Sequence, residues 1–246
     1  MRITGAQQGT SQWHRERKSL ITATDVPIIL GSNPYQNMTT LLQSKKSDTT
    51  NAVNAATNWG NAFESIAATV YDIKHPSNGR VSTQPPLIRH SRIAYLAASP
   101  DRIVDEGCVR YLLEIKCPYQ RSIRDKVSTM HVHQVQHQLE VADLEYGYIW
   151  ECVFEKREDS DELKGYNISG YMSDTGLYWF LRESKLTRVD RDRAWYHSVV
   201  MPRLEVFHKS MVADSPCSVD HLQRKRKRDT KTSQDATAEH SSVVLN

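Results

Sequence analysis

The chain has 246 residues and a net charge of +3, because 32 basic side chains are nearly balanced by 29 acidic ones. This length, with 39% hydrophobic residues, suits one large domain that can form its own core. Bulk charge therefore neither requires nor excludes a nucleic-acid partner, and the distribution of charge along the chain has to decide.

The sequence shows no sign of secretion or of a membrane span. Its first twenty residues, MRITGAQQGTSQWHRERKSL, lack an apolar stretch of signal-peptide length, and no run approaches the roughly 18 apolar residues of a membrane helix. We therefore expect a soluble, intracellular protein without a membrane partner. Cys108, Cys117, Cys152 and Cys217 form no C-x-x-C pair, so we expect free thiols rather than a zinc ribbon, a redox dithiol or an iron–sulfur cluster.

The segment from Gln12 to Asp25 is basic and rich in hydroxyl groups. Thr24 is predicted to cap a short helix over residues 26–30, with Pro27 in its first turn. A helix N-terminus beside an arginine such as Arg17 is suited to bind an anion. The residues alone also fit an ordinary capped helix that follows a solvated basic segment.

Two helices are predicted next, over residues 38–46 and 59–73, separated by a polar loop over 47–58. The second helix has an apolar stripe at i, i+3, i+4 and i+7 spacing, formed by Phe63, Ile66, Ala67, Val70 and Ile73. Glu64 lies beside this stripe. By itself, a glutamate there is typical of a surface charge that the helix dipole favours.

Three strands are predicted after a turn at 75–79: residues 87–90, a strand from 95–98 that continues past Asp101 into 103–104, and residues 109–116. The order of helices, strands and a further helix indicates an α/β (α+β) fold with a mixed central sheet. On the third strand the side chains alternate, so Glu114 and Lys116 share one face while Leu113 and Ile115 pack on the other.

A hairpin between the second and third predicted strands would bring Asp101 beside Glu114. Two carboxylates and the ammonium of Lys116 would then meet. Such a group is the minimum needed to hold Mg²⁺ against a phosphodiester and to activate a water molecule.

A basic loop around residues 121–126 leads into a predicted helix over 130–142. Gln134 and Gln138 lie on a face next to its apolar side, where glutamines are typically polar surface. His133 and His137 are four residues apart and fit a metal pair, but the glutamate of the zinc protease motif is absent between them, which disfavours zinc.

The C-terminal part is predicted to contain a strand over residues 146–154, a partner strand over 166–172 and a long helix over 189–211 that Pro202 kinks. We divide the chain into a domain over 1–212 and a disordered tail over 213–246. Five consecutive basic residues, 224–228, lie in this tail. Such a run is typical of a nuclear localisation signal, a phosphate-binding arm or a solubilising segment.

Five sequence motifs occur in the order WHRERKSLITATD, WGNAFE, SPD, LEIKCP and HQVQ. In this order they resemble the phage-lambda-type exonucleases, also called YqaJ-like viral recombinases, over residues 13–207. The resemblance implies a PD-(D/E)xK restriction-endonuclease-like core with helices on both sides of the sheet. It also implies a Mg²⁺-dependent exonuclease, with Mn²⁺ as a substitute, that degrades one strand of linear duplex DNA from the 5′ end for recombination or end processing.

The resemblance assigns chemical roles to individual residues. It implies that Asp101 and Glu114 are the principal metal ligands, assisted by the Ile115 carbonyl, with Glu64 near a second metal position. Lys116 would orient or deprotonate the attacking water, and nearby metal ions would lower its pKa.

Three further residues take roles from the same resemblance. Gln134 matches the glutamine that completes the active-site set. Arg17 and Thr24 occupy the positions that hold the 5′-phosphate of a DNA end, where serine is more frequent than threonine.

The implied substrate is the end of double-stranded DNA. The resemblance also allows a homo-oligomeric ring and a single-strand annealing protein as partners, and the basic tail, unusual for the phage proteins, suggests a nuclear setting. Two alternatives are an endonuclease of the same fold, of restriction or repair type, and a catalytically silent DNA-binding scaffold for recombination.

Overall fold

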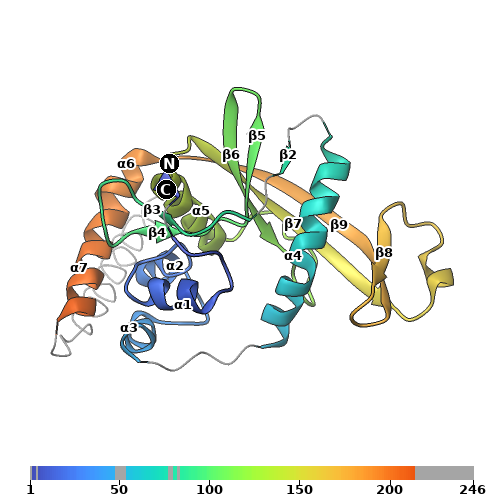
Figure 1. The fold of residues 1–246 in the computed structure, drawn as a ribbon, viewed down its shortest axis with the longest axis horizontal. Coiled ribbons are helices and arrows are strands. Elements are labelled where there is room, and N and C mark those ends of the chain that lie inside the picture. Colours follow the sequence, from blue (N-terminus) through green and yellow to red (C-terminus); the bar gives the residue numbers. More distant parts are fainter. Residues whose placement is uncertain (1, 4, 48–53, 77–79, 82–83, 214–246) are drawn as a thin grey trace, which may run out of the picture.

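The computed structural model describes residues 2–3, 5–47, 54–76, 80–81 and 84–213 (Figure 1). Its centre is a six-stranded sheet in the spatial order β2 (Arg80–Val81), β5 (Arg102–Glu106), β6 (Val109–Lys116), β7 (Tyr146–Arg157), β9 (Leu177–Asp190) and β8 (Ser169–Met172). β6 and β7 are parallel, whereas the other neighbouring pairs are antiparallel. A smaller sheet contains β1 (Arg2–Ile3), β3 (Ile88–Arg89) and β4 (Ala97–Ala98).

Helices cover both faces of the central sheet (Figure 1). On one face, α4 (Ala55–Lys74) packs Phe63 and Val70 against Leu113 and Ile115. The opposite face packs around Leu112 and is covered by α5 (Thr129–Ala142), behind which lie α2 (Val26–Leu30), α3 (Met38–Lys46) and α7 (Met201–Val212). This confirms the predicted α+β fold with a mixed sheet between helices. None of the described helices is long and apolar enough to cross a membrane.

The chain moves from the small sheet to the central sheet at Ser99-Pro100-Asp101. A continuous strand through this segment was predicted and is wrong: β4 pairs with β3, and β5 begins only at Arg102. Pro100 has no N–H to donate to a ladder, so a strand is readily interrupted there. Arg102 pairs with Leu113, which places the preceding residue, Asp101, beside Glu114, just before β5 begins.

α4 begins four residues earlier than the predicted helix. The Asn54 side chain caps it by accepting a hydrogen bond from the Thr57 N–H at 2.9 Å. Asparagine is a favoured N-cap, but here it stands in a polar, alanine-rich stretch without apolar periodicity. Residues 48–53 of the predicted loop lie outside the described residues, as does the tail from residue 214 with its basic run.

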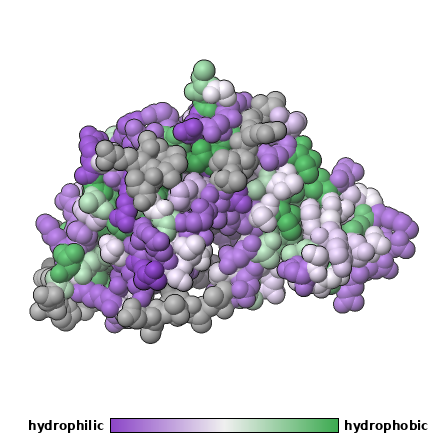
Figure 2. All heavy atoms as spheres, in the orientation of Figure 1, coloured by the Kyte–Doolittle hydropathy of each residue, from purple (hydrophilic) through white to green (hydrophobic). Residues whose placement is uncertain are grey.

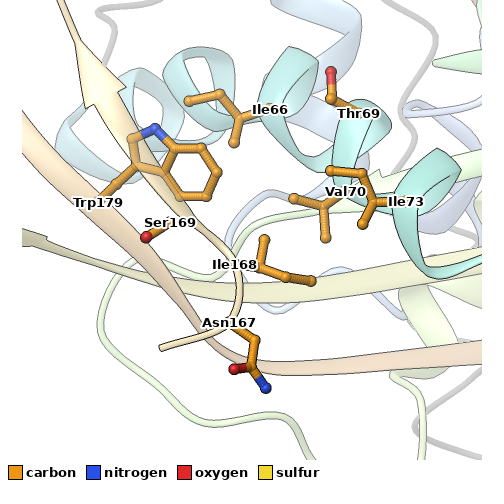
Figure 3. Close-up of a pocket in the computed structure, with 8 residues that line it drawn as sticks. All are labelled: Ile66, Thr69, Val70, Ile73, Asn167, Ile168, Ser169 and Trp179. Atoms are coloured by element: carbon orange, nitrogen blue, oxygen red, sulfur yellow. The ribbon is translucent and has the colours of Figure 1, made fainter. Parts of the chain in front are cut away.

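The apolar stripe of α4 is only partly buried. Ile73 is 59% exposed, in contrast to the prediction, because the end of the helix extends beyond the core. Together with Ile66 and Val70 it lines a mainly apolar pocket of about 320 Å³, which Ile168 and Trp179 close from the other side (Figure 3).

Two predictions for the C-terminal region are wrong in their boundaries. Val189 lies in β9, and the helical region starts with α6 (Arg193–Trp195), continues through a π-helical turn (Tyr196–Val200) and leads into α7. Pro202 follows this irregular turn, as expected of a residue that cannot donate to the carbonyl four positions earlier. The predicted partner strand is shorter, β8, and pairs with β9 rather than with β7.

His133 and His137 do not converge on a common point. The His137 ring lies 2.7 Å from the Tyr196 hydroxyl and 3.1 Å from the Ala97 carbonyl, whereas His133 Nδ1 lies 2.8 Å from the Ser32 hydroxyl. The two rings therefore connect α5 to different neighbours.

The buried His137 makes the fold sensitive to acid. Burial lowers the pKa of His137 to about 4, so its folded-state pKa lies below that of the unfolded chain, about 6.5. The neutral ring stabilises the fold above pH 6.5, and this contribution is lost as pH falls toward 4, by up to about 1.4 kcal/mol per pH unit. For His137→Gln we expect a smaller loss of free energy of unfolding between pH 7 and pH 5 in urea titrations. Exposed His14→Gln serves as the control, and an unchanged pH dependence in His137→Gln would contradict the assignment.

Candidate active site

The turn at Ser99-Pro100-Asp101 holds the Asp101 carboxylate against the end of β6. Its Oδ2 accepts a hydrogen bond from the Ile115 N–H at 2.7 Å. On the other side, α1 (Ser11–Lys18) and the residues before it fix the turn. The Trp13 indole N–H donates to the Ser99 hydroxyl at 2.9 Å, and the Gln8 amide donates to the Pro100 carbonyl at 3.0 Å.

Glu114 is 1% exposed, and three side chains donate hydrogen bonds to its carboxylate. Lys116 Nζ and Gln134 Nε2 each lie 2.5 Å from Oε1, and Gln138 Nε2 lies 2.7 Å from Oε2. The two glutamines come from successive turns of α5, so this helix fixes both oxygens of the carboxylate.

Gln138 is a site residue that sequence reasoning missed. It was predicted as polar surface, but it is fully buried, and its Oε1 has no partner among the described residues. The spacing of four residues from Gln134 was visible in the sequence. The sequence did not show that this face of α5 turns toward Glu114.

Glu64 reaches the same region from α4. Its Oε1 accepts hydrogen bonds from Arg102 Nη1 at 2.9 Å and from Gln84 Nε2 at 3.1 Å. Neither donor was predicted. Arg102 follows Asp101 directly in the sequence, whereas Gln84 stands in a segment without any recognisable pattern.

Glu64, Asp101 and Lys116 line one pocket of about 270 Å³. Ile115 and Cys117 continue its wall along the end of β6, and the opposite wall consists of the first turns of α4. Glu114 lies behind this lining and is joined to it through Lys116. The face of the molecule between α1 and α4 is hollowed and mainly hydrophilic (Figure 2).

The charges in this region act strongly on one another. Burial, reinforced by the charges of Glu114 and Glu64, raises the pKa of Asp101 well above its usual value. Burial alone would lower the pKa of Lys116, but the nearby Glu114 and Asp101 carboxylates outweigh it and raise that pKa. With these charges alone, Lys116 is a protonated counter-ion, and the lowered pKa expected for a base requires additional positive charge beside it.

The donor set suits a hard divalent cation. Carboxylate and carbonyl oxygens are the ligands that Mg²⁺ prefers. Burial raises the pKa of Asp101, and the neighbouring Glu114 and Glu64 carboxylates raise it further. As the side chains lie, no group of three or more His, Cys, Asp or Glu residues in the described part of the chain converges closely enough to hold a metal ion. The glutamines and Lys116 engage the Glu114 oxygens instead.

Arg17 and Thr24, the residues predicted to hold a 5′-phosphate, lie next to each other. Arg17 Nη2 donates a hydrogen bond to Thr24 Oγ1 at 2.8 Å, and the guanidinium carbon lies 4.4 Å from the centre of the Trp13 ring. Trp13 therefore connects this pair to Ser99, two residues before Asp101. The link between the two predicted sites is a contact that the sequence did not indicate.

The prediction that Thr24 caps α2 is wrong. Asp25 occupies the N-cap position and makes no capping hydrogen bond with its side chain. Its Oδ2 instead accepts from the Thr22 N–H at 2.7 Å and lies 2.7 Å from Lys45 Nζ. Because Thr24 is not engaged as a cap, its hydroxyl is available to Arg17.

Residues 12–145, slightly more than half of the chain, match the family profile described as the YqaJ-like viral recombinase domain. The chain belongs to this family. An uncharacterized protein of Acanthamoeba polyphaga mimivirus is 26% identical to the YqaJ-like chain over 178 residues, which cover 66% of this chain and 32% of that protein. A protein of African swine fever virus (isolate Tick/Malawi/Lil 20-1/1983) is 25% identical over 157 residues, which cover 53% of this chain and 45% of that protein. The YqaJ-like chain thus spans about a third to a half of the length of these relatives.

Two solved structures have the same fold as this YqaJ-like chain. An alkaline exonuclease from Laribacter hongkongensis superposes with a TM-score of 0.60 at 23% identity, over 89% of this chain and 99% of that one. A phage-related exonuclease from Haemophilus somnus 129PT gives a TM-score of 0.54 at 13% identity, over 78% of this chain and 93% of that one. The predicted family and fold are both confirmed.

Proposed function

We propose that this YqaJ-like chain is a divalent-metal-dependent deoxyribonuclease that degrades one strand of linear duplex DNA from its 5′ end. The observation that carries the proposal is the pocket in which Glu64, Asp101 and Lys116 meet, with Glu114 fixed directly behind them. Membership of the viral recombinase family and the fold shared with alkaline exonucleases support it.

The carboxylates of Asp101, Glu114 and Glu64, with the Ile115 carbonyl, would hold Mg²⁺ or Mn²⁺. When bound, such a cation stabilises the negative charge that develops on the attacking and leaving oxygens of a phosphodiester. Gln134 is assigned to the catalytic set because it orients the Glu114 carboxylate.

Lys116 is proposed to face the attacking water. Positive charge next to it lowers its pKa, which is the direction that a base requires, and its ammonium form can donate a hydrogen bond to a phosphate oxygen. Its 2.5 Å contact with Glu114 fixes its side chain at the pocket wall.

Arg17 and Thr24 are proposed to bind the terminal 5′-phosphate. A guanidinium and a hydroxyl supply charged and neutral donors, and the planar guanidinium is well matched to phosphate oxygens. Stacking on Trp13 restricts the orientation of Arg17. Duplex DNA ends are therefore the proposed partner, while a homo-oligomeric ring, an annealing protein and a nuclear location stay predictions of the sequence.

End-labelled linear duplexes test this function. Substrates with a 5′-phosphate, a 5′-hydroxyl or a blocked 5′ end are incubated with Mg²⁺, with Mn²⁺ and with EDTA, beside a closed circular duplex. We expect metal-dependent loss of the 5′-phosphorylated strand and an intact circle. Cleavage of the circle would favour an endonuclease of the same fold, and no cleavage with either metal would favour a silent DNA-binding scaffold.

Arg17→Ala is expected to reduce the preference for 5′-phosphorylated over 5′-hydroxyl ends by a factor of about 10 to 100. This is the range for a lost hydrogen bond to a charged group. The ratio of kcat/KM on the two substrates measures this preference. Arg15→Ala, an exposed position on the same helix, is the matched control. An unchanged ratio in Arg17→Ala refutes the phosphate-binding role.

A further inference from the structure

The wall of the pocket opposite the end of β6 is formed by one face of α4. The residues on this face follow helical spacing and are Ala56, Thr57, Gly60 and Asn61. Across the pocket stand Asp101 and Lys116. A substrate that reaches these two residues must also pass along the surface of α4.

Gly60 is an unfavourable residue for the interior of this helix. It is the sixth residue of the 20-residue helix Ala55–Lys74, where glycine destabilises the helix relative to alanine. Its φ is not in the positive range, so the backbone does not require glycine. A Cβ built on Gly60 would have no atom within 4 Å, so packing does not require it either.

The other glycines in the described part of the chain each have a structural reason. Five have positive φ: Gly9, Gly31, Gly107, Gly165 and Gly176. A Cβ would come closer than 3 Å to a neighbouring residue at the remaining three, which are Gly5, Gly147 and Gly170. Gly60 is the described glycine that neither the backbone conformation nor the neighbouring atoms explain.

We propose that the substrate itself requires Gly60: the sugar-phosphate backbone of the strand being cut lies against the bare backbone of α4 at this residue. Glycine allows a ligand to approach a main chain closely. On the proposed nuclease function, the phosphate at this point faces Asp101 and Lys116, and the sugar beside it occupies the space that a side chain at position 60 would fill. The exposed carboxamide of Asn61, one residue along the same wall, offers a polar contact to the same backbone.

α4 is held firmly at this wall. The Trp59 ring lies 5.4 Å from that of Tyr119, in the segment after β6, and the Phe63 ring stacks on Phe154 of β7 at 4.6 Å. Glu64, on the next turn, is joined to Arg102. A methyl group at position 60 meets no protein atom, so it projects into the pocket, and the packing of α4 limits any shift of the helix that would restore the space for the substrate.

Substitutions at position 60 separate this role from a role in folding. Gly60→Ala is expected to unfold at the same or a higher temperature than the wild type, as is the control Ser65→Ala, which lies on an exposed part of α4 outside the pocket. On 5′-phosphorylated duplex DNA with Mg²⁺, Gly60→Ala should lose about tenfold or more in kcat/KM, whereas Ser65→Ala should keep the wild-type value. Gly60→Ser, which is larger again, should lose more.

A second measurement tests the contact without catalysis. The affinity for the same duplex is measured in EDTA, where we expect weaker binding by both Gly60 variants and unchanged binding by Ser65→Ala. Folded Gly60→Ala with wild-type kcat/KM and wild-type affinity overturns the inference. Failure of the wild type itself to hydrolyse DNA would instead refute the proposed function, while the affinities in EDTA would still test the role of Gly60.

Discussion

On the proposed function, Lys116→Ala is expected to lower kcat for DNA hydrolysis by about 10²- to 10⁴-fold, the usual contribution of a positioned general base, and to leave DNA binding nearly unchanged. Lys116 lines the pocket and contacts Glu114, whose carboxylate still has Gln134 and Gln138 as donors after the substitution. Single-turnover hydrolysis and binding in EDTA, measured on the same variant, separate the two effects.

Two further variants sharpen this result. Lys116→Arg keeps the positive charge but cannot give up its proton near neutral pH, so its inactivity supports a base and its activity supports a counter-ion. Lys164→Ala, with a side chain 79% exposed, is the control for the loss of a lysine elsewhere. Full activity of Lys116→Ala would refute the assignment of this pocket as the catalytic centre.

Asp101→Asn is expected to act in opposite directions on activity and on stability. It removes a proposed metal ligand, so hydrolysis should fall by about 10²- to 10³-fold. The amide oxygen can still accept from the Ile115 N–H, while the repulsion from Glu114 and Glu64 disappears. The metal-free variant should therefore be more stable than the wild type.

The gain in stability should depend on pH with a definite sign. Burial and the charges of Glu114 and Glu64 raise the pKa of Asp101 in the folded state. The stabilisation that this raised pKa provides is fully present below the unfolded value, about 3.9, and is lost as pH rises through the folded value. In urea titrations with EDTA, the advantage of Asp101→Asn should be larger at pH 8 than at pH 5.

Asp105→Asn provides the comparison for this variant, because Asp105 lies on β5, the strand that follows Asp101, in an exposed pair with Arg110. We expect little change in its stability at either pH. A less stable Asp101→Asn at pH 8 would show that Asp101 is not repelled by its neighbours. Wild-type activity of the variant would show that Asp101 is not required for the reaction.

The strand that bears Glu114 and Lys116 was predictable from the sequence to the residue. Its last four residues, 113–116, alternate between apolar and charged, and Pro118 follows two positions later. Local chemistry therefore predicts the strand, its end and the face that each of these side chains takes. Helix α5 followed in the same way from its apolar positions.

The rest of the site depends on contacts between distant segments. The strand breaks at Pro100 because β4 pairs with β3 and so belongs to a second sheet. No local sequence pattern indicates this pairing. Gln138 is buried because α5 is covered on both sides, by the central sheet and by other helices. Gln84 reaches Glu64 from a segment without periodicity.

Trp13 holds Arg17 on its ring face and the Ser99 hydroxyl on its indole N–H, so one rigid side chain sets the spacing between the two halves of the proposed site. An end-binding arginine and a cutting centre that share such a spacer cannot move apart independently. On the proposed function, these two contacts of Trp13 would fix the distance between the bound 5′ end and the bond that is cut.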